Sequence, residues 1–193
     1  MLPKYKYTEV IDYWQSQNIN DTIKLSTMLD SFQILFAYNS GVIENKEITY
    51  HDIRKIFANG KVIDFTGNLR TLYEITNQKD CAEYLINKII NKEPLSVKFI
   101  KKIHKLLTKG TYDEVRYNKN LECPGEFKKH DYVTGRNEVG SSGNNVNTDM
   151  QQLVEEIKSV KKTDSENIIK IASYFHNVLE QIHPFADYMG RLG

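Results

Sequence analysis

Residues 171–182 read IASYFHNVLEQI, and residues 183–191 read HPFADYMGR. The first stretch completes a run of apolar side chains at helical spacing, which predicts a helix with a continuous buried face. That face consists of Ile168, Ile169, Ala172, Phe175, Leu179 and Ile182. A proline disfavours helical backbone in the residue before it, so Pro184 predicts that the helix ends at about His183. We therefore expect the imidazole of His183 to face a cleft.

The residues after this helix predict a site for phosphate chemistry. Asp187 lies four residues after His183 and offers a hard oxygen ligand suited to Mg²⁺. Gly190 and Arg191 follow, and they can meet phosphate through a backbone N–H and a guanidinium. A general base, a metal ligand and an anion clamp are the parts of a phosphoryl or nucleotidyl transferase. From these residues alone, the alternative is a His-Pro turn with a purely structural role.

The rest of the chain predicts a mainly α-helical protein. Apolar residues recur at helical spacing in segments near 22–38, 49–59, 69–90 and 96–107. The face expected to be buried in the first segment consists of Leu25, Met28, Leu29, Phe32, Leu35 and Phe36. That helix is expected to stop near residues 39–41, which read Asn-Ser-Gly. Helix starts are predicted from capping residues, at Thr49 with Asp52, at Ser96, and at Thr163 with Glu166.

A different kind of segment occupies residues 110–148, which hold five of the ten glycines and have almost no periodic apolar face. It predicts a long loop with a short hairpin, and helix is expected to return at about Met150. Loops of this length in a compact domain usually have a function or are disordered. Two alternatives therefore stay open, a loop that lines a site and a mobile surface loop.

Length and composition exclude several classes of protein. A chain of 193 residues suffices for one core with an appended segment. Lys and Arg number 26 against 25 Asp and Glu, so no basic field favours nucleic acid or a membrane as partner. Cys81 and Cys123 form no CxxC pair, and without a signal peptide or membrane span we expect a cytoplasmic protein. The other histidines lack the spacing of a zinc site, and His176 is expected to pack against the core.

Two motifs in the chain resemble those of the Fic family. HPFADYMGR at residues 183–191 resembles the signature HxFx[DE]GN[GK]RxxR, and SGVIEN at residues 40–45 fits the inhibitory pattern [ST]xxxE[GN]. GEFKKHDYVTG, residues 125–135, is placed like the family's flap over a bound target. The resemblance runs from about residue 35 to residue 193 and leaves residues 1–34 as an N-terminal helical segment. It implies an all-α, Fic-fold helical bundle with a small β-hairpin flap.

The resemblance also implies a protein adenylyltransferase that uses ATP and Mg²⁺. His183 would act as general base on a Ser, Thr or Tyr hydroxyl of a target protein, which then attacks the α-phosphate of ATP. Asp187 would hold Mg²⁺, and Phe185 would anchor the motif in the core. The nucleotide and its phosphates would lie against Tyr188, Met189, Gly190 and Arg191.

The same resemblance implies an inhibitory segment and a flap. Glu44 would project into the nucleotide site, with Ser40 and Asn45 fixing the backbone around it. The alternative for Glu44 is an ordinary solvent-facing glutamate. The flap would include Phe127, Lys128 and Lys129, although a basic run in a loop is usually just solvated.

The motif also departs from the family's pattern. Tyr188 and Met189 replace Gly and Asn, so tyrosine adds bulk and methionine offers no donor to phosphate. The sequence ends at Gly193, one residue before the motif's second arginine, so we expect a truncated C-terminal helix. An open alternative is a catalytically impaired Fic-like module that binds nucleotide or protein. Transfer of another group, such as phosphate or phosphocholine, self-modification and homodimer formation also stay open.

Overall fold

Helices form the framework of the structure, a computed structural model that describes residues 7–44, 46, 48–59, 69–134, 137–161 and 164–187. They are α1 (Tyr7–Ser16), α2 (Thr22–Glu44), α3 (Tyr50–Asn59), α4 (Leu69–Ile90), α5 (Val97–Leu107), α6 (Val146–Ser159) and α7 (Ser165–Ile182). The π-helical turn η1 (Val115–Lys119) and the antiparallel strands β1 (Tyr132–Thr134) and β2 (Asn137–Val139) lie between α5 and α6. The predicted all-α class is confirmed. None of the helices in the described ranges is long and apolar enough to cross a membrane.

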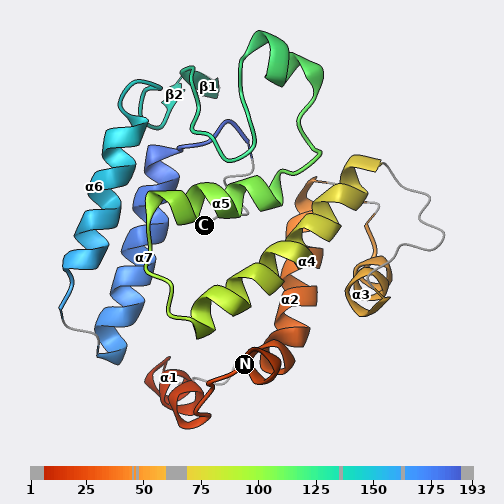
Figure 1. Cartoon of the computed structure of the whole chain (residues 1–193), viewed down its shortest axis with the longest axis vertical. Coiled ribbons are helices and arrows are strands. Elements are labelled where there is room, and N and C mark those ends of the chain that lie inside the picture. Colours follow the sequence, from red (N-terminus) through yellow and green to blue (C-terminus); the bar gives the residue numbers. More distant parts are fainter. Residues whose placement is uncertain are drawn as a thin grey trace.

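The helices pack as two groups that are joined through α5 (Figure 1). In the first group α6 and α7 lie side by side and α5 packs against α6, around a core of Ile100, Phe127, Val146, Met150, Leu153, Val154, Leu179, Ile182 and Phe185. In the second group α2, α3 and α4 surround a core of Ile34, Ala37, Ile48, Ile53, Ile56 and Ile75. Because α4 also contacts α5, helix α5 connects the two cores.

Only the second half of α7 lies in the first core. Leu179 and Ile182 are buried, whereas Ile168 and Ile169 are 39% and 38% exposed. The predicted continuous buried stripe is therefore wrong for the first half of the helix, because only its last two turns reach the core cluster. His176 is exposed as well, so its predicted packing against the core is also wrong.

Helix α2 differs most from its sequence-based prediction. It continues through residues 39–41 to Glu44 instead of stopping near residue 38. Gly41 lies within the helix, where a Cβ atom would meet the Cδ1 atom of Ile48 at 2.9 Å, so glycine allows close packing there. The buried face holds Leu25, Ile34, Ala37 and Gly41, and the predicted members Phe32, Leu35 and Phe36 are exposed. The apolar residues of α2 lie on most sides of the helix, so their spacing could not single out the buried side.

Capping side chains set the helix starts near the predicted positions. The Thr49 hydroxyl accepts a hydrogen bond from the backbone N–H of Asp52 at 3.2 Å, and α3 begins at Tyr50, directly after Thr49. The Ser96 hydroxyl does the same for the N–H of Phe99, which confirms the start of α5. Asp164 caps α7, and Thr163 lies outside the described residues. Helix α6 begins earlier than expected, at Val146, so the predicted long loop is shorter and includes η1.

Candidate functional site

His183 terminates α7 and is held in an unusual backbone conformation. Its φ of 48° lies in the left-handed region, which few residues other than glycine adopt. Its backbone N–H still donates to the carbonyl of Leu179 at 3.0 Å. The helix therefore ends where Pro184 predicted, and the half-buried imidazole lies at the junction between α7 and the following segment.

The backbone around His183 is clamped by the segment between α5 and α6. The N–H of Ser141 donates to the carbonyl of Ile182, and the N–H of Lys128 donates to the carbonyl of Pro184, both at 2.9 Å. Gly140 packs against the same turn with a φ of +75°. A Cβ atom on Gly140 would lie 2.3 Å from the Ile182 carbonyl oxygen and 2.5 Å from the Cβ of His183. This contact makes glycine necessary at position 140.

The surroundings of His183 favour its neutral form. Burial is the main cause that lowers the pKa of His183 below its ordinary value of 6.5, and the positive charge of Lys128 lowers it further. Glu180 opposes these effects. At neutral pH most of the imidazole is therefore unprotonated and able to accept a proton.

The predicted flap residues have two different environments. Phe127 is buried in the first core, and Lys128 is 2% exposed. Burial lowers the pKa of Lys128, and Asp131 opposes that effect. Lys129 is exposed and pairs with Glu126 at 3.3 Å. The expectation that this basic run is solvated therefore applies to Lys129 and is wrong for Lys128, whose backbone also clamps the turn after α7.

His104, which belongs to none of the motifs in the sequence, holds the segment after His183 in place. It is fully buried on α5, and its Nδ1 atom accepts from the N–H of Gly125 at 3.0 Å. The proton is therefore assigned to Nε2, which donates to the backbone carbonyl of Asp187 at 3.2 Å. Its ring stacks on Phe185 with a centroid distance of 3.8 Å and an interplanar angle of 4°. Its position on the apolar face of the predicted helix was the available signal.

Burial also decides the charge of His104. Desolvation lowers its pKa from 6.5 to about 4, although the carbonyl and the charge of Asp187 both act to raise it. His104 is therefore neutral at physiological pH. It acts as a fixed hydrogen-bonding spacer between α5 and the segment that carries Asp187.

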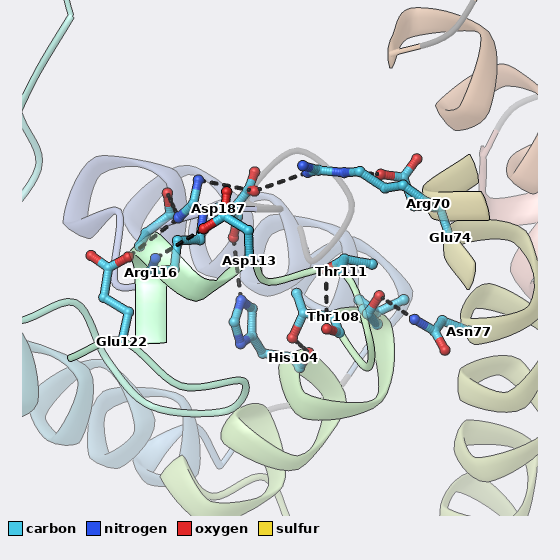
Figure 2. Close-up of polar contacts among 12 residues, drawn as sticks. Arg70, Glu74, Asn77, His104, Thr108, Thr111, Asp113, Arg116, Glu122 and Asp187 are labelled. Atoms are coloured by element: carbon cyan, nitrogen blue, oxygen red, sulfur yellow. Dashed lines mark hydrogen bonds and ion pairs between the residues drawn. The ribbon is translucent and has the colours of Figure 1, made fainter. Parts of the chain in front are cut away.

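Asp187 lies between two arginines that come from distant parts of the chain (Figure 2). Its Oδ2 atom is 3.2 Å from Nη2 of Arg70, at the start of α4, and 3.2 Å from Nη2 of Arg116, in η1. Arg70 also pairs with Glu74, and Arg116 also pairs with Glu122. No spacing in the sequence relates these residues, so only the fold reveals the network.

The Fic/DOC family model matches residues 94–193, just over half of the chain. The chain belongs to the Fic/DOC family. The matched region contains α5, the clamping segment, α6, α7 and the His183 turn. The predicted resemblance to the Fic family is therefore confirmed.

Solved structures of Fic proteins share the fold of this Fic/DOC chain. A Fic domain containing signaling protein from Bacteroides thetaiotaomicron matches with a TM-score of 0.73 and 21% identity, over 96% of this chain and 68% of that one. A Fic family protein from Desulfovibrio desulfuricans matches with a TM-score of 0.66 and 18% identity, over 96% and 52%. Fic-1 from C. elegans matches with a TM-score of 0.68 and 18% identity, over 97% of this chain and 53% of that one. The chain thus spans about half the length of the last two. No curated protein matches its sequence.

Fic proteins generally use Mg²⁺, and the described residues could bind this ion in one specific way. No group of three or more His, Cys, Asp or Glu side chains within the described ranges is placed to hold a metal ion by itself. Mg²⁺ in nucleotide sites is usually bound through one or two carboxylates together with phosphates and water. Asp187 therefore fits as a single protein ligand to an ion that arrives with a nucleotide.

Several predicted site residues of this Fic/DOC chain lie outside the described residues. They are Asn45, Tyr188, Met189, Gly190 and Arg191, and the same holds for the side chain of Glu44. Ser40 is half-buried in the last turns of α2. The inhibitory role of residues 40–45 and the phosphate-binding role of residues 188–191 stay predictions.

Proposed function

We propose that this Fic/DOC protein is a protein adenylyltransferase, which moves AMP from ATP to a Ser, Thr or Tyr hydroxyl of a target protein. The observation that carries the proposal is that a neutral His183 and Asp187 lie on one short segment, whose backbone is fixed by hydrogen bonds. The first group can accept a proton, and the second can hold the metal of a nucleotide. Family membership supports the reaction class, since the family includes enzymes that transfer AMP.

In the proposed reaction, a ring nitrogen of His183 accepts the proton of the target hydroxyl. The hydroxyl oxygen then forms a bond to the α-phosphorus, the bond from that phosphorus to the bridging oxygen breaks, and pyrophosphate leaves with the bond electrons. Asp187 would be the protein ligand of the Mg²⁺ that arrives with ATP, and that ion would supply charge neutralisation at the phosphates. The clamps at Ser141 and Lys128 keep the base in position, so little reorientation is required.

We also propose that Glu44 restrains this activity, as the inhibitory pattern predicts. The motif lies in and just after the last turns of α2, which pack against Ile48 through Gly41. That packing supports the described part of the motif, close to α3. Replacing Glu44 by glycine is then expected to increase transfer.

A second candidate function follows from Tyr188 and Met189, which replace the family's Gly and Asn. A site without that glycine and that donor favours a Fic-like module that binds nucleotide or a protein without catalysis. Incubation with ATP labelled either at the α-phosphate or at the γ-phosphate, with Mg²⁺ and a cell lysate, separates the candidates. Transfer of the α-label alone, increased by Glu44→Gly, supports adenylyl transfer. Transfer of the γ-label indicates a phosphotransferase, and nucleotide binding with no transfer in either variant supports the second candidate.

The charge of Lys128 should be visible in the titration of His183. Lys128→Gln removes a positive charge that lowers the pKa of His183, so that pKa should rise toward 6.5 while burial still holds it below. Lys129→Gln, the matched control, removes an exposed charge that pairs with Glu126 and should leave the pKa unchanged. NMR titration of the His183 ring measures both. Equal titration of wild type and Lys128→Gln would show that Lys128 does not act on His183.

A further inference from the structure

Arg70 and Arg116 surround Asp187 in a way that suggests more than a structural ion pair. Five charged side chains form an alternating chain, Glu74–Arg70–Asp187–Arg116–Glu122 (Figure 2). It links α4, η1 and the segment after His183. Both guanidinium groups approach the same oxygen atom of Asp187, each at 3.2 Å.

The outer and central members of this chain differ in their exposure. The outer carboxylates are buried, with side-chain exposures of 8% for Glu74 and 3% for Glu122. Asp187 and Arg116 are 28% and 26% exposed, and Arg70 is 48% exposed. Each arginine is therefore paired with a buried acid of its own, whereas the two arginines and Asp187 are all partly exposed where they meet. This partial exposure and the convergence of two guanidinium groups are features that suit the binding of an anion from solvent.

In this arrangement the two arginines would compete with a metal ion for the carboxylate of Asp187. A carboxylate paired with two guanidinium groups is a poor ligand for a divalent cation, because the positive charges repel the ion. An ion that brings its own phosphates removes this conflict, since Asp187 can turn to the metal while the arginines turn to phosphate oxygens. Every charge then keeps an opposite partner.

We propose that Arg70 and Arg116 form a phosphate-binding pair for the nucleotide, and that the carboxylate of Asp187 occupies this pair while no nucleotide is bound. This inference rests on the proposed function for the identity of the ligand. The two arginines lie outside the HPFADYMGR motif, on α4 and η1. They supply phosphate donors in a chain whose motif has lost the family's asparagine.

The test measures the binding of inorganic tripolyphosphate by calorimetry in EDTA, so that neither metal nor catalysis contributes. Asp187→Asn removes the competing carboxylate and should strengthen binding about tenfold or more relative to wild type. Asp80→Asn, the matched control on the exposed side of α4, makes the same change in net charge and should alter binding less than twofold.

Charge-neutral double variants then locate the bound anion. Arg70→Gln with Glu74→Gln, and Arg116→Gln with Glu122→Gln, each remove an arginine together with its buried partner, so no buried charge is left unpaired. Each pair, added to Asp187→Asn, should abolish the tenfold gain. Arg54→Gln, on the exposed face of α3, should preserve it. If one double variant fails to fold, as judged by circular dichroism, the other still decides the outcome.

The outcomes separate this inference from the proposed function. Equal tripolyphosphate binding by wild type and Asp187→Asn, or a gain that survives both double variants, would overturn the phosphate-binding pair even if AMP transfer is observed. A gain that depends on the arginines, in a protein that transfers no AMP, would leave the pair established and the proposed enzyme refuted.

Discussion

His104→Ala should lower the free energy of unfolding by about 4 kcal/mol, the largest loss of stability expected from any single side chain described above. The substitution removes a fully buried ring stacked on Phe185 and leaves a cavity in its place. It also leaves the N–H of Gly125 and the carbonyl of Asp187 without their buried partner. Urea denaturation measures the change, and His176→Ala, on the exposed side of α7, should cost less than about 0.5 kcal/mol.

The pH dependence of stability gives a second signature of His104. Its pKa is about 4 in the folded protein and about 6.5 when unfolded, so the unfolded chain binds more protons between these values. The stability that comes from burying His104 in its neutral form is fully present above pH 6.5. The free energy of unfolding then falls by roughly 3 kcal/mol as the pH decreases to 4. His104→Phe keeps an aromatic ring but cannot titrate, so its stability should depend less on pH in this window. A variant with the wild-type pH dependence would contradict the buried, neutral state of His104.

Gly140→Ala should reduce AMP transfer at least a hundredfold and lower the free energy of unfolding by about 3 kcal/mol. The added methyl group would lie 2.3 Å from a backbone carbonyl oxygen, which no side-chain rotation can relieve. The turn that carries His183 must then shift, and a displacement of about 1 Å at a catalytic group is enough for such a loss.

Gly110→Ala is the matched control, because Gly110 has nearly the same φ of +74° but the nearest atoms to its Cβ would be those of the Tyr73 ring, at 3.5 Å. It should show the cost of the left-handed conformation alone, about 1 kcal/mol, with little change in transfer. Similar effects of the two substitutions would mean that the contact between Gly140 and His183 has no special role.

Local chemistry explains which parts of the fold were predictable. The starts of α3 and α5 follow from the hydroxyls of Thr49 and Ser96, which act within three residues. The end of α7 follows from Pro184, which acts on its immediate neighbour. The buried face of α2 was predicted wrongly, because that face depends on what packs against the helix. Spacing alone does not contain this information when apolar residues lie on several sides.

In the candidate site, too, local features were predictable from the sequence and tertiary contacts were not. His183 and Asp187 belong to one motif and could be found from their spacing and from the resemblance to Fic proteins. His104 is 83 residues from Asp187 in sequence, and Arg70 is 117 residues from it, so their contacts exist only after the helices have packed. The burial of Lys128 is likewise a tertiary effect, since its neighbour Lys129 is exposed.

The central claim is that His183 accepts the proton of a target hydroxyl during AMP transfer. The rate at which purified protein, with Mg²⁺ and ATP, adds the mass of AMP to itself or to an identified target tests this claim most directly. His183→Ala should reduce that rate by a factor of about 100 or more, while His176→Ala, seven residues earlier on the same helix, should leave it unchanged. Transfer by His183→Ala at the wild-type rate would contradict the account.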